Sequence, residues 1–364
     1  MEDLALYNFT VKSSIQDYSV FFTDDAAKEL QSAYQPGDVV IIDQIVQEAY
    51  PQLLDGDAIP QDKVIVIEAI ERTKSYQGVE PIINQLIRGG FRKNHRLIAI
   101  GGGITQDVVA FMASILYRGV QWIFFPTTLL AQGDSCIGSK TSINFNEYKN
   151  QVGGFYPPQK IFIDPQFLRT LTLAELKSGL GEMAHYFVVA GQEDFDRYKR
   201  DYPAALEDFN VINGLTQRSL EIKKSFVEID EYDRKERQVF NYGHSFGHAI
   251  ESFYKYAVPH GVAVSFGMDM SNFVSMKKGY IQESDFIHMR ELFTQIWSEF
   301  SIADLDVDVL IDALKKDKKN VDNQLGLILN KGAGRVFKDL TDPDKTFRSW
   351  MIEYMETYHK KKSK

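Results

Sequence analysis

The chain has 364 residues, of which 44% are hydrophobic and 25% charged, enough to build two domains with a core each. Its formal net charge of -9 excludes the broad basic surface of a general nucleic-acid or anionic-membrane binder, so any anionic substrate must meet a local basic pocket. The single cysteine, Cys136, excludes an internal disulfide framework and a cysteine-based zinc finger, and it fits a reducing compartment.

The two ends of the chain predict no membrane targeting. The first residues, MEDLALYNFT, lack a basic stretch followed by an apolar one, so we expect no signal peptide. No apolar run approaches the ~20 residues that span a bilayer, and the C-terminal HKKKSK is typical of a solvated tail. We therefore expect a soluble, cytoplasmic protein.

Five short β-rich runs alternate with amphipathic helical patterns over the first half of the chain. In order, they are DVVIIDQIV, KVIVIEAI, HRLIAIGGG, VQWIFFPTT and KIFIDP. Continuous apolar strands separated by helices predict a parallel sheet that is covered on both faces. We therefore expect residues 1–170 to form an α/β domain of the nucleotide-binding type.

The turn after the third of these runs is rich in glycine. LIAIGGGITQDVVAF puts three glycines between a strand and a helix, where the backbone can approach a phosphate and the helix N-terminus offers unpaired N–H groups. A nucleotide pyrophosphate is the natural ligand, and Asp43, at the end of an earlier strand, could bind a ribose hydroxyl. Because the spacing is not G-x-G-x-x-G, a plain tight turn stays an alternative, as does a helix cap for Asp43.

Long segments of helical period begin near residue 171. They include TLAELKSGLGEMAHYFVVAG, INGLTQRSLEIKKSFVEIDEYD and GVAVSFGMDMSNFVSMKKG. At their start, Thr172 could cap a helix, with Glu175 three residues on. We expect residues 171–364 to form a mainly helical domain that packs against the first domain around a cleft.

Histidines and one glutamate stand out in the helical half. In SGLGEMAHYFV, Glu182 and His185 share one helical face, a spacing that suits a metal pair, an acid/base pair or merely a helix edge. In FNYGHSFGHAIES, His244 and His248 are one turn apart, and His260 opens a later helix. With Glu182 they give a two-histidine, one-carboxylate set and a histidine to spare, which favours a catalytic zinc-like site. Histidines satisfied within the core are the alternative.

Basic residues occur in segments that could line a cleft. Each alone is typical of a solvated surface charge. Beside a phosphate-type loop and a metal set, they indicate a small acidic, phosphorylated substrate held by charge-assisted hydrogen bonds. These residues are Lys140, Lys149, Lys223, Lys224, Arg237, Lys315, Lys316, Lys318 and Lys319.

Several of these segments together resemble the 3-dehydroquinate synthase family, one of the sugar phosphate cyclases. The matching stretches run in family order from about residue 71 to 330: GGGITQDVVAF, YRGV, FPTTLLAQGDSCIGSKTSIN, YKNQVGGFYPP, FLRTL, SGLGEMAHY, NYGHSFGHAIE, HGVAVSFGM and DKKN. The resemblance implies an N-terminal Rossmann-like NAD-binding domain and a C-terminal helical, metal- and substrate-binding domain. It also implies a homodimer with NAD and a divalent metal, zinc or cobalt, in the interdomain cleft.

The resemblance also implies roles for individual residues. The metal ligands would be Glu182, His244 and His260. The NAD site would contain Asp43, Glu71, Lys74, Gly102, Gly103, Asp107, Thr127, Thr128, Lys140, Lys149 and the stretch from Phe167 to Thr170. Substrate contacts would come from Asp134, Lys140, Asn150, Lys223, Arg237, Asn241, His248 and Lys318 or Lys319, with Arg118 reaching into the partner subunit's site and His185 one turn from the metal.

The implied reaction converts 3-deoxy-arabino-heptulosonate 7-phosphate into 3-dehydroquinate and phosphate, a step of the shikimate pathway. NAD oxidises a ring hydroxyl, the new ketone acidifies the neighbouring C–H so that phosphate leaves, and the hydride returns before the carbocycle closes. Because NAD is regenerated in every turnover, the protein chiefly binds, orients and neutralises charge.

The substrate carboxylate is the feature that separates the related cyclases. Arg237 matches the family arginine that binds this carboxylate, and Asn241 also matches the family pattern. Cyclases that act on neutral sugar phosphates generally lack the arginine. The two residues therefore favour the carboxylated sugar as substrate.

Several positions depart from the family pattern. Ser139 and Ser142 replace glycines, Ala69-Ile70 replaces an acidic-glycine pair, and His185 replaces a lysine whose charge is fixed. An alternative is therefore a related cyclase that makes a cyclitol or aminocyclitol precursor from another sugar phosphate, such as sedoheptulose 7-phosphate. A glycerol-dehydrogenase-type oxidoreductase and an inactive homologue are two further alternatives.

Overall fold

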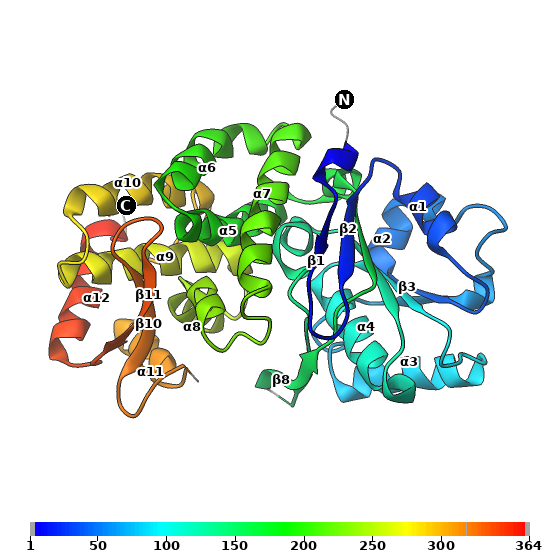
Figure 1. Cartoon of the computed structure of the whole chain (residues 1–364). Helices are drawn as coiled ribbons and strands as arrows, with labels where there is room; N and C mark the ends of the chain where they lie inside the picture. Colours follow the sequence, from blue (N-terminus) through cyan, green and yellow to red (C-terminus); the bar gives the residue numbers. More distant parts are fainter. Residues whose placement is uncertain (1–3, 147, 318, 361–364) are drawn as a thin grey trace. The chain divides into compact units, whose positions relative to one another are not determined.

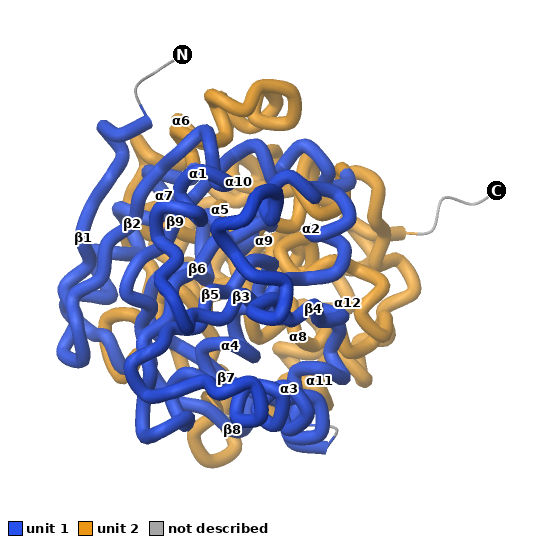
Figure 2. Tube along the Cα trace, turned by 90° about the vertical axis from the view of Figure 1, so that its right-hand side faces the viewer, with its two compact units in different colours: residues 1–172, 216–232 blue, residues 173–215, 233–364 orange. Residues whose placement is uncertain are grey.

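A computed structural model describes residues 4–146, 148–317 and 319–360 of the chain (Figure 1). The chain divides into two compact units (Figure 2): unit 1 comprises residues 1–172 and 216–232, and unit 2 comprises residues 173–215 and 233–364. The sequence placed a boundary after residue 170 and assigned everything beyond it to the helical domain. Helix α7 (Phe209–Val227) instead contributes residues to both units.

Within the described part of unit 1, the main sheet has seven strands in the order β1-β2-β9-β6-β5-β3-β4, and only β1 and β2 are antiparallel to each other. All five strands expected from the sequence belong to its parallel part, which confirms the Rossmann-like fold class. The strands are β1 (Phe9–Val11), β2 (Tyr18–Phe22), β3 (Val39–Asp43), β4 (Val64–Ile67), β5 (Leu97–Gly101), β6 (Trp122–Pro126) and β9 (Lys160–Ile163).

Helices cover both faces of this sheet. One face packs against α1 (Ala26–Ala33) and α2 (Gln44–Ala49), and the other against α3 (Tyr76–Arg88) and α4 (Gly103–Ile115). Because side chains alternate along a strand, Leu97 of β5 packs with the second pair of helices and Ile98 with the first. Burial on both faces explains why the strands are continuously apolar.

A two-stranded antiparallel ribbon, β7 (Lys140–Phe145) and β8 (Tyr148–Phe155), accompanies the main sheet, and β7 packs against α4. The sequence did not predict strands here, although several expected cofactor and substrate residues lie in them. Two short helices of unit 1 also contain expected site residues, a π-helix (Ala131–Ser135) and a 3-10 helix (Pro165–Thr170).

Unit 2 is mainly helical, as the sequence predicted, and it also contains an unpredicted antiparallel hairpin. Residues Gly261–Ser275 of α9 are all buried, and this helix packs against α5, α8 and α10, so it forms the centre of the unit. The elements are α5 (Leu173–Ala190), α6 (Gln192–Ala205), α8 (His244–Phe253), α9 (His260–Lys277), α10 (Glu283–Ile296), α11 (Val307–Lys315), β10 (Leu325–Asn330), β11 (Val336–Thr341) and α12 (Lys345–Tyr358).

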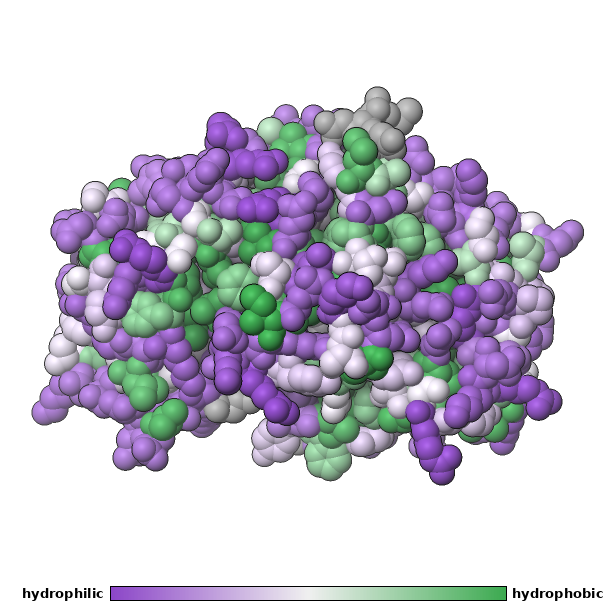
Figure 3. Space-filling model, in the orientation of Figure 1, coloured by the Kyte–Doolittle hydropathy of each residue, from purple (hydrophilic) through white to green (hydrophobic). Residues whose placement is uncertain are grey.

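Polar side chains cover most of the face shown in Figure 3, and apolar ones lie scattered among them. Among the residues that the structure describes, no helix has both the length and the apolar character needed to cross a bilayer.

Candidate functional site

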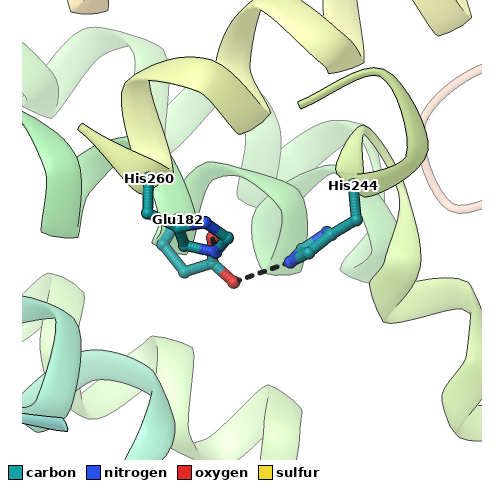
Figure 4. Close-up of side chains that lie close together, drawn as sticks. All are labelled: Glu182, His244 and His260. Atoms are coloured by element: carbon teal, nitrogen blue, oxygen red, sulfur yellow. Dashed lines mark ion pairs between the residues drawn. The ribbon is translucent and has the colours of Figure 1, made fainter. Parts of the chain in front are cut away.

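Three helices of unit 2 each contribute one side chain to a compact group of metal-ligand type. Glu182 lies in the middle of α5, and His244 and His260 are the first residues of α8 and α9. His244 Nε2 is 3.2 Å from Glu182 Oε1, and His260 Nε2 is 3.4 Å from Glu182 Oε2 (Figure 4). One ligand atom from each residue lies within 4.8 Å of the other two. The fold therefore brings together the three residues expected to hold a metal.

Glycines allow the three helices to approach closely enough for this grouping. A Cβ on Gly261 of α9 would lie 1.8 Å from the carbonyl oxygen of Ser178 in α5, and one on Gly181 would lie 2.3 Å from the carbonyl oxygen of Gly261. Between α9 and α8, a Cβ on Gly267 would lie 2.0 Å from the carbonyl oxygen of Gly243. No other residue fits at these positions without moving a helix.

The carboxylate of Glu182 is buried, yet its surroundings favour the charged form. Burial alone would raise the pKa of Glu182, but the neighbouring imidazoles of His244 and His260 outweigh it and hold the pKa well below its ordinary value. Its Oε2 makes no hydrogen bond to any residue that the structure describes. Each oxygen of this buried carboxylate faces one imidazole nitrogen, Oε1 that of His244 and Oε2 that of His260, and a divalent cation would complete the arrangement. The donor set of two nitrogens and one carboxylate fits zinc or cobalt with open coordination positions.

Each histidine of the set also has a partner behind it. His244 Nδ1 is 3.3 Å from the carbonyl oxygen of Tyr242, and His260 Nδ1 is 3.1 Å from Glu251 Oε2. The sequence analysis missed Glu251, although its position seven residues after His244, two turns along the same helix, could have indicated it. His248, Glu251 and His260 form a second group whose possible ligand atoms lie within 4.8 Å of one another.

His185 lies beside the ligand set rather than at a solvated helix edge. It is 1% exposed, and its ring centroid is 3.9 Å from that of Tyr186 and 5.6 Å from that of Phe240. Its Nδ1 is 3.8 Å from Glu182 Oε1. Because Glu182 is only 3% exposed, this geometry excludes the helix-edge interpretation of the pair.

Three expected substrate residues of unit 2 lie close in sequence to His244. Arg237, which is buried, and Asn241 occupy the 3-10 helix Glu236–Asn241 that directly precedes α8. His248 is exposed and lies one turn beyond His244.

A carboxylate anchors the DKKN segment to α8. Lys319 Nζ is 2.9 Å from Asp317 Oδ2, and the same oxygen accepts a hydrogen bond of 2.8 Å from Ser245 Oγ, next to His244. Burial would raise the pKa of Asp317, but Lys319 and these hydrogen bonds lower it overall. The segment therefore presents Lys319 from a fixed position, whereas Lys318 lies outside the described residues.

In unit 1, most of the expected cofactor residues follow the carboxyl ends of five neighbouring parallel strands, whereas Lys140 and Lys149 lie in the β7–β8 ribbon. Dinucleotides bind at this edge of open α/β sheets. The residues follow β3 (Asp43), β4 (Glu71 and Lys74), β5 (Gly102, Gly103 and Asp107), β6 (Thr127 and Thr128) and β9 (Phe167 and Thr170). The Phe167 side chain, however, is part of the hydrophobic core, so it supports the edge rather than lining it.

The glycine-rich turn combines a packing role with open space. A Cβ on Gly102, the N-cap of α4, would lie 2.9 Å from Thr128 Cγ2, whereas one on Gly103 would meet nothing within 4 Å. Asp43 Oδ1 accepts a hydrogen bond of 3.1 Å from the Ile45 amide and so caps α2. Burial raises the pKa of the Asp43 carboxyl.

Ion pairs connect four of the expected cofactor residues. Lys74 Nζ is 2.5 Å from Asp107 Oδ2, and Lys149 Nζ is 3.0 Å from Glu71 Oε1. Asp107 Oδ1 also accepts a hydrogen bond of 3.0 Å from the Ser142 amide, which ties the β7–β8 ribbon to α4. These charges are therefore already compensated within the unit.

Two expected substrate residues of unit 1 form a close pair. Lys223 Nζ of α7 donates to Asp134 Oδ1 at 2.7 Å and to its main-chain oxygen at 2.6 Å. A third, Asn150, accepts a hydrogen bond of 3.1 Å from Ser142 Oγ, so a serine that departs from the family pattern contacts an expected ligand.

Lys140 and Arg118 occupy constrained backbone segments. Ser139, directly before Lys140, has a φ of +63° and donates to Glu231 Oε1 at 3.2 Å. Arg118 has a φ of +64° and follows Tyr117, which also lies in the left-handed region. The sequence did not reveal the contribution of Glu231.

Comparisons with known proteins find relatives over most of the chain. A family model described as "3-dehydroquinate synthase N-terminal" matches residues 64–178, and one described as "3-dehydroquinate synthase C-terminal" matches residues 179–320. A 3-dehydroquinate synthase of Alkaliphilus metalliredigens (strain QYMF) is 34% identical over 313 residues, which is 84% of this chain and 87% of that protein. The corresponding enzyme of Dictyoglomus turgidum (strain DSM 6724 / Z-1310) is 36% identical over 295 residues, or 79% of this chain and 82% of that protein.

Solved structures share the fold at lower identity. A 2-deoxy-scyllo-inosose synthase is 23% identical, covers 95% of this chain and 99% of its own, and superposes with a TM-score of 0.83. A complex of this type of enzyme with carbaglucose-6-phosphate, NAD+ and Co2+ has a TM-score of 0.81 at 22% identity, covering 96% of this chain and 99% of its own. A 2-epi-5-epi-valiolone synthase from Streptomyces hygroscopicus subsp. jinggangensis 5008, with NAD+ and Zn2+ bound, gives the same TM-score, 0.81, the same identity, 22%, and the same coverage, 96% and 99%. With both family models matched in sequence order across most of its length, the chain belongs to the 3-dehydroquinate synthase family.

Proposed function

We propose that the protein is a NAD- and divalent-metal-dependent 3-dehydroquinate synthase, a phosphorus-oxygen lyase that eliminates phosphate from 3-deoxy-arabino-heptulosonate 7-phosphate and closes a carbocycle. The observation that carries the proposal is the convergence of Glu182, His244 and His260 from three helices in a chain of this family. Relatives that are 32% to 36% identical over most of the chain are 3-dehydroquinate synthases. The proposed cofactors are a divalent cation, held by these three residues, and NAD, bound at the sheet edge of unit 1.

The bound groups would supply the chemistry that side chains cannot. NAD takes up and returns a hydride, and a divalent cation polarises the oxygen that develops negative charge. The protein's own residues would bind, orient and neutralise. In unit 1, we assign substrate binding to the Lys223–Asp134 pair. Asp134 would hold Lys223 in place, and Lys223 would bind an anionic group of the substrate.

The remaining assignments follow the family positions. In unit 2, Arg237 would bind the substrate carboxylate, and Asn241, His248 and Lys319 would contact its oxygens. In unit 1, Lys140, Asn150 and Arg118 would contact the phosphate end, Arg118 from the partner subunit of a homodimer. The enzyme would work in the cytoplasm, in the shikimate pathway of aromatic amino-acid biosynthesis.

A cyclase of the cyclitol or aminocyclitol type is the second candidate. It is favoured by His185, which lies 3.8 Å from Glu182 where the family has a lysine, and by Ser142, whose hydroxyl contacts Asn150. Both substitutions alter the surroundings of expected ligands, so they could change which hydroxyls the site accepts. The higher identity to 3-dehydroquinate synthases, 34% against 23%, places this candidate second.

A parallel assay of three sugar phosphates tests the proposal. The protein, supplied with NAD and Zn2+ or Co2+, would be incubated with 3-deoxy-arabino-heptulosonate 7-phosphate, sedoheptulose 7-phosphate or glucose 6-phosphate while phosphate release is followed. We expect release from the first sugar alone. Turnover of only a neutral sugar phosphate would establish the second candidate instead.

A further inference from the structure

Glu251 lies behind His260, on the opposite side of the ring from Glu182. His260 Nδ1 is 3.1 Å from Glu251 Oε2, and Nε2 of the same ring is 3.4 Å from Glu182 Oε2. The carboxylate side chains are 12% and 4% exposed, so both are largely removed from water. The imidazole therefore stands between two mostly buried carboxylates.

Only the contact with Glu251 is a hydrogen bond, since Glu182 Oε2 accepts none among the described residues, and this difference favours Nδ1 as the site of the proton in a neutral ring. A neutral imidazole has one N–H group and one nitrogen lone pair. When Nδ1–H donates to Glu251, the lone pair is at Nε2, the nitrogen that faces Glu182. His244 has the same orientation, but its Nδ1 faces the main-chain oxygen of Tyr242. The Glu251 carboxylate is charged, whereas the Tyr242 main-chain oxygen is not. A side-chain substitution removes the acceptor of His260 but leaves that of His244 in place.

The connection between α8 and α9 holds the two residues in this relation. Lys255 and Tyr256 both have positive φ angles, +50° and +63°, so the chain reverses sharply after α8. The Tyr256 amide donates to the main-chain oxygen of Glu251 at 2.8 Å. The main chain of Glu251 thus stabilises the turn that leads to His260, and its side chain contacts the His260 ring.

We propose that Glu251 is a positioning residue, which fixes the tautomer and the ring orientation of His260 for a divalent cation bound by Glu182, His244 and His260. The inference rests on the proposed function, which supplies the cation. Two carboxylates with two neutral imidazoles also balance the charge of a divalent ion. Outer partners of this kind typically change metal affinity by about 10- to 100-fold.

The competing assignment is that Glu251 is itself a ligand, with His248 and His260, of a second cation. The Nδ1 of His260 cannot donate to Glu251 and bind a cation at the same time. The separation of 3.1 Å has ordinary N–H···O length, as the positioning role requires. The number of cations bound per chain distinguishes the two assignments.

The test compares wild-type protein with Glu251→Ala, Glu251→Gln and a control, Glu353→Gln, which removes an exposed carboxylate of unit 2 that pairs with Lys277. Zn2+ affinity and stoichiometry would be measured by chelator competition. The tautomer of His260 would be read from 15N spectra of metal-free, histidine-labelled protein at a pH high enough that the ring is neutral, with the signal assigned from a His260→Gln variant. Melting curves would establish that each variant folds.

We expect one cation per chain and an Nδ1–H tautomer in the wild type and the control. Glu251→Ala should weaken Zn2+ binding by about 10- to 100-fold and shift His260 toward the Nε2–H tautomer. Glu251→Gln, which keeps a neutral acceptor, should retain the Nδ1–H tautomer and lose less Zn2+ affinity than Glu251→Ala. If the alanine variant does not fold, the Zn2+ affinity of the glutamine variant tests the positioning role. Unchanged affinity and tautomer, or a second cation lost with Glu251, would overturn the proposal. Failure of the wild type to bind any cation would refute the proposed function, while the metal-free tautomer would still test Glu251.

Discussion

At the scale of single residues, Glu182 is the group on which His244 and His260 converge. We expect Glu182→Gln to weaken Zn2+ binding by more than about 100-fold, beyond the loss caused by removing an outer partner, because the amide lacks the charge and one of the two acceptor oxygens. Metal-dependent activity should disappear with it. Equilibrium dialysis and activity assays would check this, with the exposed Glu207→Gln as control. Full activity in Glu182→Gln would refute the ligand role.

His185 offers a second test at this scale. Its side chain is buried between aromatic rings, 3.8 Å from Glu182, so a lysine here would bring a fixed positive charge to the ligand set. We expect His185→Lys to fold and to change kcat/KM on at least one of the three sugar phosphates by roughly tenfold, equivalent to ~1.4 kcal/mol. Unchanged kinetics on every substrate would show that the residue does not influence the site.

Sequence spacing predicted a metal set of two histidines and a carboxylate, and the family resemblance selected Glu182, His244 and His260 for it, but most of the supporting residues were missed. The i, i+4 spacing of His244 and His248 is a local pattern that helical period reveals, whereas it does not say which of the histidines belong to the set. Glu251 follows the same period and was predictable in principle. The Ser245–Asp317 contact joins residues 72 positions apart in the chain, and only the folded structure brings such pairs together.

At the scale of elements, the contact between α5 and α9 is the feature that positions the ligands. A Cβ on Gly261 would lie 1.8 Å from the Ser178 oxygen and 2.6 Å from the Glu182 nitrogen, so the helices would have to separate. We expect Gly261→Ala to destabilise the protein by about 1–3 kcal/mol and to weaken metal binding. Urea unfolding would measure the first effect and chelator competition the second.

Gly154 provides the matched control for this substitution. A Cβ there would meet nothing within 4 Å, so Gly154→Ala should change stability by less than about 0.5 kcal/mol. Equal stability losses at the two glycines would contradict the close-packing argument.

The β10–β11 hairpin contains a partly buried carboxylate, Asp339, so its stability should respond to pH. Asp339 of β11 accepts hydrogen bonds from Lys278 Nζ, from Tyr280 Oη at 2.8 Å and from Thr341 Oγ1 at 2.7 Å. Burial would raise the pKa of Asp339, but these donors outweigh it and lower the pKa below 3.8. The ionised group therefore stabilises the fold above pH 4, and this contribution is lost as pH falls through the lowered pKa.

We accordingly expect Asp339→Asn to be less stable than wild type by about 1–2 kcal/mol at pH 7. The difference should stay constant down to about pH 5 and narrow below about pH 4, because the wild-type carboxyl then becomes protonated. Urea unfolding at several pH values would measure it, with the exposed Asp312→Asn as control. A difference that grows on acidification would contradict the assigned direction of the pKa change.

The elements differ in how far the sequence could predict them. The five parallel strands are continuous apolar runs between helical segments, and all five were found. The β7–β8 ribbon was not predicted, because β8 has no fully buried residue and its sequence therefore lacks the apolar pattern of a strand. In β10 all six residues are buried, which gives an apolar run without the alternation that identifies a half-exposed hairpin strand.

At the scale of the whole molecule, the chain forms two units, and each unit consists of two separate stretches of the sequence. Helical period identified the segment around α7, but membership of a unit depends on contacts with distant residues. Ser219, for example, donates to the main-chain oxygen of Gly133 at 2.8 Å, and Lys223 pairs with Asp134. The helix thereby delivers one expected substrate residue to unit 1, an outcome that composition and period could not reveal.

In the proposed reaction, the protein eliminates phosphate and uses NAD catalytically. The most direct measurement follows phosphate release and NADH absorbance together, with 3-deoxy-arabino-heptulosonate 7-phosphate in large excess over NAD and with Zn2+ or Co2+ present. We expect many phosphates released per NAD, carbocyclic product in an amount equal to the phosphate, and no net NADH. Accumulation of one NADH per substrate consumed, or no release of phosphate, would contradict it.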